Sequence, residues 1–173
     1  MAIPKQVKSD RIVFKIGSYE WLTHYGLAIA LMTLGLIGVY SIIKDIVTER
    51  QIDSVYLAFH LPILLLSLLA YWVQSKKLIF RILCSQIEVD KNRDKIEDLL
   101  KNTGWEIEIS NKRLLIASFE GRFCDEELIL KYNSKNILWT AINHPGNHNS
   151  FASQLCRMSK ARKLVAQIRE TCA

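Results

Sequence analysis

The residues best suited to chemistry fall in two short polar segments, 120–125 and 143–150. Together they hold two carboxylates, a guanidinium, a thiol, two imidazoles and several amides, the groups that bind anions, ligate metals or transfer protons. A helix is expected to begin near residue 150, and its N-terminus would offer N–H groups and partial positive charge to a phosphate or a lipid headgroup. We interpret five residues as a candidate ligand-binding edge: Arg122, Asp125, His144, Asn147 and His148.

Other interpretations of these segments remain open. Residues 144–148 also have the composition of a polar surface turn, which needs no ligand. A metal held by His144 and His148 needs further ligands, and Cys124 and Asp125 would complete the set only if the two loops touch. Nucleophilic catalysis by Cys124 would need an oxyanion-binding motif and an orienting third group, neither of which the sequence shows. We therefore predict no metal, no cofactor and no catalytic residue.

An antiparallel sheet is expected to position the polar segments. Four runs rich in β-branched and aromatic residues, separated by turn residues, are predicted strands: 105–109, 113–119, 127–132 and 136–142. The first run alternates apolar residues with glutamates, which indicates a sheet with one wet face. If the strands pair in sequence order as a meander, both polar segments lie at the same end of the sheet.

Two helices should cover one face of this sheet. One is expected over 91–102, with Asp90 as its N-cap and Gly104 after its end. The other should run from about 150 to 171, because apolar residues recur there at three- and four-residue steps. Residues 78–89 are expected to prolong a preceding helix and then form a short strand. The predicted fold is a small α+β two-layer domain over 76–173, made of two helices and a meander of about four strands.

The last helix also carries basic residues beside its apolar stripe. Arg157, Lys160 and Lys163 are candidate contacts to the membrane surface or to a protein partner. No aromatic platform accompanies them, so nucleic acid is not expected as a partner.

Two long apolar runs precede the domain. Residues 21–43 and 54–75 lack Asp, Glu, Lys and Arg over about 20 residues each, which is enough to cross about 30 Å of hydrocarbon. Aromatic residues lie near their ends, where amphipathic rings settle at the headgroup level. We predict a transmembrane hairpin over 21–75, in which Pro62 kinks the second helix without breaking it. A buried core hairpin of a soluble protein is the alternative, and a cleaved signal peptide fits less well.

The flanking charges predict the orientation of the hairpin. The tail 1–20 holds four basic residues and the exit from the second run holds three, whereas the link 44–53 has only Lys44 and Arg50. The positive-inside rule therefore places both termini in the cytoplasm, in what we expect to be a bacterial inner membrane. His24 and His60 lie within the apolar runs and are expected to form hydrogen bonds inside the hairpin rather than relay protons. The run 11–16 favours β structure and should either pair with the domain or lie at the interface.

Charge and cysteine content are consistent with this location. The formal net charge of +6 is mild and is explained by proximity to an anionic leaflet. The four cysteines, Cys84, Cys124, Cys156 and Cys172, lack metal-ligand spacing, so free thiols are expected.

Residues 89–168 carry, in this order, Gly104-Trp105, Leu115 to Ala117, Arg122 to Leu128, and Arg162 in the last helix. In this order they resemble a family of uncharacterised bacterial domains. Family members carry a Gly-Phe-x-Asp-Asp run before a strand, an Arg-Ser-x-Ser strand end and an Asn-x-x-Arg pair. Here Glu126 replaces the second Asp, residues 139–143 lack the Arg-Ser-x-Ser run, and Ser159 replaces the Asn. The resemblance implies a fold and lends no reaction.

The sequence thus predicts a membrane-anchored cytoplasmic interaction or regulatory domain without catalytic activity. Its expected partners are the lipid bilayer and a protein partner or second copy, with anionic headgroups as further ligands. One alternative is a small membrane-bound enzyme or anion-binding protein that uses the loop edge at Asp125, His144 and His148. Another is an accessory subunit of a transport or secretion complex, with Gly35 and Gly38 packed against other chains.

Overall fold

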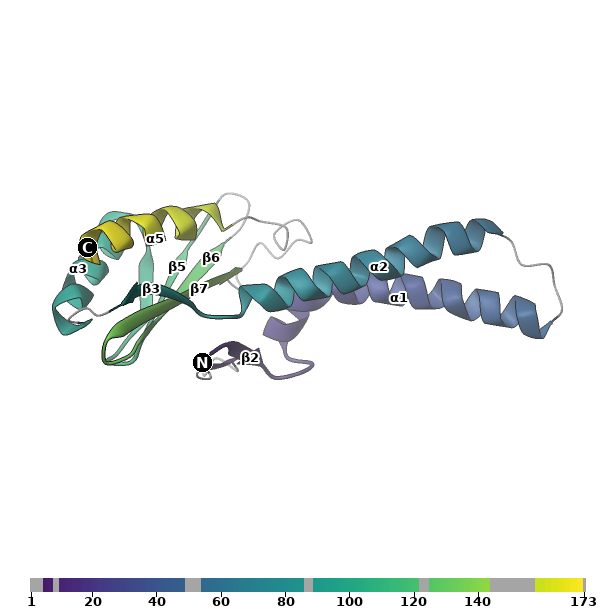
Figure 1. Ribbon diagram of the computed structural model, residues 1–173, viewed down its shortest axis with the longest axis horizontal. Coiled ribbons are helices and arrows are strands. Elements are labelled where there is room, and N and C mark those ends of the chain that lie inside the picture. Colours follow the sequence, from purple (N-terminus) through teal and green to yellow (C-terminus); the bar gives the residue numbers. More distant parts are fainter. Residues whose placement is uncertain are drawn as a thin grey trace.

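The computed structural model describes residues 5–7, 10–48, 54–85, 89–121, 125–143 and 158–172. A long two-helix hairpin projects from one end of a two-layer α+β domain (Figure 1). The C-terminal helix ends at the side of the domain that is remote from the hairpin, whereas the N-terminal strands lie beside the junction of the two parts (Figure 1).

The hairpin consists of α1 (Tyr19–Val47) and α2 (Ser54–Lys77). Both helices are long and apolar enough to cross a membrane, and only 17% and 11% of their apolar windows are buried. A core hairpin of a soluble protein would be mostly buried, so the described part of this chain does not supply the cover that this alternative requires. Helix α2 continues through Pro62, as predicted.

Small residues let the two helices approach closely. A Cβ on Gly38 would overlap the ring of His60, and one on Gly35 would overlap the side chain of Leu64. Gly35 and Gly38 are buried, in contrast to the outward-facing Leu36 and Ile37. The glycines therefore pack against the neighbouring helix of this hairpin. The packing against other chains that the transport-subunit alternative expects stays a prediction.

The domain contains a sheet of five antiparallel strands in the order β3-β7-β6-β5-β4. These are β3 (Arg81–Ser85), β4 (Glu106–Ser110), β5 (Leu114–Phe119), β6 (Glu126–Tyr132) and β7 (Asn136–Asn143). The predicted meander is confirmed, and the strand count is corrected from about four to five.

Strand β3 also corrects the expected helical continuation. Helix α2 ends at Lys77, and a strand begins at Arg81 and pairs with β7. Its register shifts between Ile82 and Cys84, and the consecutive residues Leu83 and Cys84 are both buried. Such a bulge interrupts the alternation of inward and outward residues, which is the pattern that identifies a strand in a sequence.

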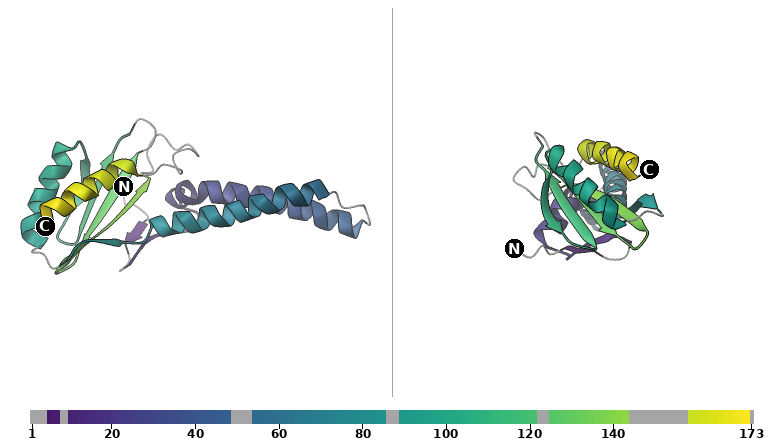
Figure 2. Two further views of the ribbon diagram at one scale, coloured as in Figure 1. Left: turned by 45° about the horizontal axis from the view of Figure 1, so that its top comes forward. Right: turned by 90° about the vertical axis from the view of Figure 1, so that its left-hand side faces the viewer.

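Helices α3 (Val89–Asn102) and α5 (Ser159–Cys172) cover one face of the sheet (Figure 2). Ile96 and Leu100 of α3 and Leu164 and Ile168 of α5 belong to the core that they form with the sheet. Gly104 has a φ of +80°, as expected of a residue after a helix end. Helix α3 begins at Val89, so Asp90 lies in its first turn and not at the predicted N-cap position.

The opposite face of the sheet is covered by the N-terminal tail. Strands β1 (Lys5–Val7) and β2 (Ile12–Phe14) form a separate two-stranded sheet. Ile12 and Phe14 form a second core with Ile116 and Ile129 of the large sheet. The predicted wet face is therefore wrong where this core lies. In β4 the register shifts between Ile107 and Ile109, which pack against different cores, so their alternation did not mark a single buried face.

Candidate functional site

The strand ends that flank the two polar segments lie together, as the meander predicted. Phe119 pairs with Glu126, and Glu126 pairs with Asn143, at the end of the sheet where α5 begins. Among the five predicted edge residues, the structure describes Asp125, which is buried and accepts a 3.1 Å hydrogen bond from the main-chain N–H of Gly121. The other four lie outside the described residues: Arg122, His144, Asn147 and His148. The ligand-binding edge stays a prediction.

A carboxylate of the chain itself occupies the start of α5. The two oxygens of Glu126 accept hydrogen bonds from the main-chain N–H groups of Lys160, at 3.2 Å, and Ala161, at 2.7 Å. Glu126 is 2% exposed, which is unusual for a charged side chain without such partners. An anion at this place would therefore have to be held by groups other than these two N–H donors.

The predicted basic contacts on α5 are partly described. Lys160 and Lys163 are exposed, and the ammonium of Lys160 lies 5.4 Å from the ring centroid of Phe119. Arg157 lies outside the described residues. Both lysines are available to a surface or a partner.

The hairpin and the domain are joined by hydrogen bonds on both sides of the short connection between α2 and β3. The hydroxyl of Thr140 donates to the main-chain oxygen of Lys77 at 2.6 Å. The tail pairs with the connection itself, because Ile12 donates to the oxygen of Leu78 and Phe80 donates to the oxygen of Asp10, both at 3.0 Å. These bonds fix the position of the domain relative to the hairpin.

The first helix is held at the same place. Nε2 of His24 donates a 3.0 Å hydrogen bond to the main-chain oxygen of Gln74, which confirms the expected role of this histidine. Tyr25 stacks on Tyr71 with 5.0 Å between ring centroids, and its hydroxyl lies 3.3 Å from the hydroxyl of Ser75. The N-terminal turns of α1 therefore belong to the junction as much as to the hairpin.

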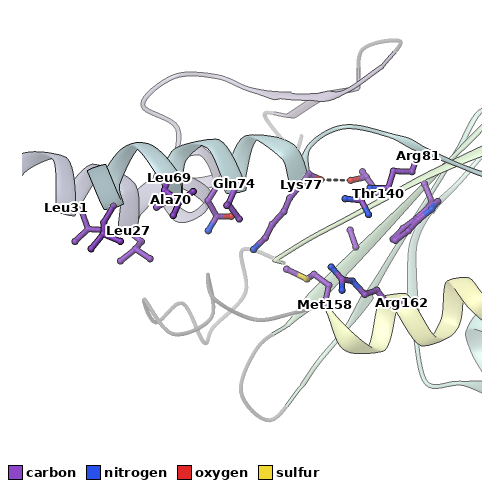
Figure 3. Close-up of a pocket in the computed structure, with 14 residues that line it drawn as sticks. Leu27, Leu31, Leu69, Ala70, Gln74, Lys77, Arg81, Thr140, Met158 and Arg162 are labelled. Carbon is purple, nitrogen blue, oxygen red and sulfur yellow. Dashed lines mark hydrogen bonds between the residues drawn. The ribbon is translucent and has the colours of Figure 1, made fainter. Parts of the chain in front are cut away.

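A pocket of about 490 Å³ opens at this junction (Figure 3). Its wall along the hairpin is apolar and comes from Leu27, Leu31, Leu66, Leu69, Ala70 and Val73. Toward the domain it is bordered by Trp139, Thr140 and Ala141 of β7 and by Met158 before α5. Strand β3 pairs with β7 only as far as Trp139, so the next residues of β7 are left to border the pocket.

The domain end of the pocket is strongly basic. Lys77, Arg81 and Arg162 line it, and its described lining includes no Asp or Glu. Figure 3 shows Lys77 extending from the end of α2 and Arg162 extending from α5 into the space between these two helices. The guanidinium of Arg81 lies 5.9 Å from the ring centroid of Trp139. Three cations from three elements thus face one hollow, which lowers the free energy of a bound anion through the local potential.

The polar groups of the described lining include the cations Lys77, Arg81 and Arg162, the amide of Gln74 and the hydroxyl of Thr140. The described lining includes no His, Cys or carboxylate. The hydroxyl of Thr140 is already donated to Lys77. No group of three potential metal ligands occurs among the residues that the structure describes.

The sequence interpretation missed this pocket. Lys77 and Arg81 entered it only as orientation charges, and Arg162 only through the family resemblance. The sequence signal that could have indicated a basic site here was the presence of Lys77 and Arg81 shortly after the apolar run 54–75. Arg162 lies 81 positions beyond Arg81 in the sequence, so only the fold brings the third cation to them.

The chain matches no protein-family model, and comparisons with curated proteins and with solved structures also found no match. The resemblance of residues 89–168 to the uncharacterised bacterial family therefore stays a prediction.

A second basic hollow lies at the other end of the sheet. It is lined by Asp90 and Lys91 at the start of α3, by Lys131 of β6, and by residues of the turns before β5 and after β6, among them Lys112, Arg113 and Lys135. This hollow provides matched positions for charge controls, because it is remote from the hairpin.

Proposed function

We propose that this chain is an integral membrane protein whose hairpin anchors a non-enzymatic binding domain at the cytoplasmic surface of a bacterial inner membrane. The observation that carries the proposal is the exposed apolar surface along both helices. Helices α1 and α2 pack together at Gly35 and Gly38, and many of their other leucines and isoleucines are exposed. Examples are Leu34, Leu36, Ile37, Leu65 and Leu68. A surface of this kind is stable in lipid or against another protein, not in water.

The dimensions of the hairpin support this proposal. Helix α1 has 29 residues, or about 43 Å at 1.5 Å per residue, and its first turns belong to the junction. The remainder matches a hydrocarbon core of about 30 Å. Tyr71 and Trp72 near the domain and Tyr40 near the far end are exposed, as expected of rings at the two interfaces.

The rigid junction supports a regulatory role for the domain. A flexible tether would only raise the local concentration of the domain near the membrane. Here the bond from Thr140 to Lys77 and the pairing of residues 10–12 with residues 78–80 hold the domain in one orientation on the hairpin. A partner that binds the domain would therefore respond to how the hairpin sits in the bilayer.

Membrane integration is tested on the full chain by extraction of membranes with alkaline carbonate. We expect the protein to stay in the pellet. A C-terminal fluorescent-protein fusion should fluoresce, and a phosphatase inserted after Thr48 should be active outside the cytoplasm. Release by carbonate would contradict the anchor, whereas reversed reporter activities would contradict only the orientation.

The partner surface is tested by pull-down from membranes in mild detergent. Arg157→Glu, Lys160→Glu and Lys163→Glu together should lose the protein or second copy that purifies with the wild type. The matched control carries the same charge change in the second basic hollow, at Lys91, Lys112 and Lys135. Equal retention by the first variant and the wild type would contradict binding through α5.

A further inference from the structure

We propose that the junction pocket binds one anionic glycerophospholipid from the cytoplasmic leaflet, with its phosphate between Lys77, Arg81 and Arg162. This inference rests on the proposed membrane anchor, because the ligand comes from the surrounding bilayer. It adds a ligand and a binding site to that proposal.

The two ends of the pocket differ in chemistry along the hairpin axis. Leu27, Leu31 and Leu69 lie on the hairpin side, and the three cations lie on the domain side (Figure 3). A phospholipid has the same order of parts, with acyl chains toward the middle of the bilayer and phosphate at its surface. The pocket therefore presents each part of the lipid with a complementary wall.

The pocket lies at the depth where a headgroup belongs. Lys77 ends α2 and Lys76 packs over the exposed ring of Trp72 at 5.5 Å, an arrangement typical of the membrane interface. The leucines on the opposite wall come from the apolar part of both helices. A volume of about 490 Å³ lies within the usual range for ligand pockets and is sufficient for a headgroup and the adjoining part of an acyl chain.

Charge complementarity selects an anionic lipid over a zwitterionic one. Three cations and no described carboxylate surround the domain end of the pocket. A phosphocholine headgroup brings its own ammonium to this site, whereas phosphatidylglycerol brings a net negative charge. An arginine can donate two parallel hydrogen bonds to a phosphate. Arg81 and Arg162 are both capable of this type of contact.

The test uses native mass spectrometry of the full chain after reconstitution in nanodiscs made of phosphatidylcholine and phosphatidylglycerol in equal amounts. We expect one retained phosphatidylglycerol, with a preference of about ten-fold or more, since each basic group near an anionic lipid contributes appreciably. Lys77→Gln, Arg81→Gln and Arg162→Gln together should abolish the preference. Lys91→Gln, Lys112→Gln and Arg113→Gln remove the same charge at the remote hollow and should leave it unchanged.

Two further variants make the result decisive. Arg162 is exposed on α5, so Arg162→Glu should fold and still weaken retention. Ala70→Trp fills the apolar wall without changing any charge. It should prevent lipid retention, whereas a site for free phosphate would be unaffected by this change and would be competed by added inorganic phosphate.

The inference is overturned if the wild type retains both lipids equally, or if Arg162→Glu and the triple variant keep the preference. Such results with a carbonate-resistant protein would leave the membrane anchor intact. Release of the protein by carbonate would instead contradict the anchor, and the lipid site with it.

Discussion

The hydroxyl of Thr140 in β7 donates a 2.6 Å hydrogen bond to the main-chain oxygen of Lys77 at the end of α2. Thr140 is 3% exposed, so this bond lies inside the junction. Thr140→Val keeps the shape of the side chain and leaves the acceptor without its donor. We expect the free energy of unfolding to fall by about 1 kcal/mol, and Tm by about 2–4 °C, measured by thermal unfolding of the full chain in detergent.

The matched control is Thr33→Val. The exposed hydroxyl of Thr33 donates to the main-chain oxygen of Ile29 one turn earlier in α1. Loss of this hydrogen bond should change the Tm little, because it joins no two elements. Equal shifts for both variants would show that the bond between β7 and α2 has no special role.

Gly38→Ala should destabilise the hairpin. The new Cβ would overlap the His60 ring near the point where that side chain leaves its own helix, so the helices must move apart. Overpacking costs about 1–3 kcal/mol, which outweighs the gain of at most about 1 kcal/mol in helix propensity. We expect a lower Tm of the full chain in detergent.

Gly35→Ala should have the smaller effect of the two. Its Cβ meets the outer atoms of the Leu64 side chain, which can change rotamer. Ile37→Phe adds bulk on the exposed side of α1 and serves as the control for size alone. A Gly38→Ala protein as stable as the wild type would contradict the described helix contact.

Ile12→Ala should release the N-terminal strand from the sheet. Ile12 is 1% exposed and packs in the core that contains Ile116 and Ile129. Truncation of a buried Ile costs about 2–5 kcal/mol. We expect faster cleavage of the tail by trypsin and a lower Tm. Ile16→Ala, at a position that is 81% exposed, should change neither quantity.

Alkylation should distinguish the two described cysteines. Burial, together with a hydrogen bond with the thiol of Cys172, raises the pKa of Cys84 to about 12. At pH 8 the Cys84 thiol is therefore almost wholly protonated, and the thiolate is the reactive form. Iodoacetamide followed by peptide mass spectrometry should label Cys172 first and Cys84 only after denaturation. Equal rates in the folded protein would contradict this environment for Cys84.

Local patterns were enough to predict the hairpin, α3 and the four-stranded meander. The two hairpin helices coincide with long apolar runs, and the meander strands are separated by tight polar turns. The positions of these elements can therefore be predicted from residues that are close together in the sequence. The glycine after α3 was identified for the same reason. Each of these elements begins or ends within two or three residues of its predicted limits, apart from the longer first helix.

The remaining parts depend on contacts between distant residues. A short strand was expected late in residues 78–89, but β3 begins at Arg81, and its bulge hides the alternation by placing Leu83 and Cys84 side by side in the core. The cover of the second sheet face was missed because Ile12 and Ile129 are more than 100 positions apart. The basic pocket likewise needs Arg162 to meet Lys77, which no local pattern encodes.

The pairing of residues 10–12 with 78–80 has a mechanical consequence for the proposed anchor. Because the junction carries hydrogen bonds on both sides, a tilt of the hairpin turns the whole sheet through the same angle. A mismatch between the apolar length of a hairpin and the thickness of the bilayer is one cause of such tilts. The end of the domain remote from the proposed membrane, where the second basic hollow lies, is farthest from the junction. A change in the tilt of the hairpin would therefore displace this end more than any other part of the domain.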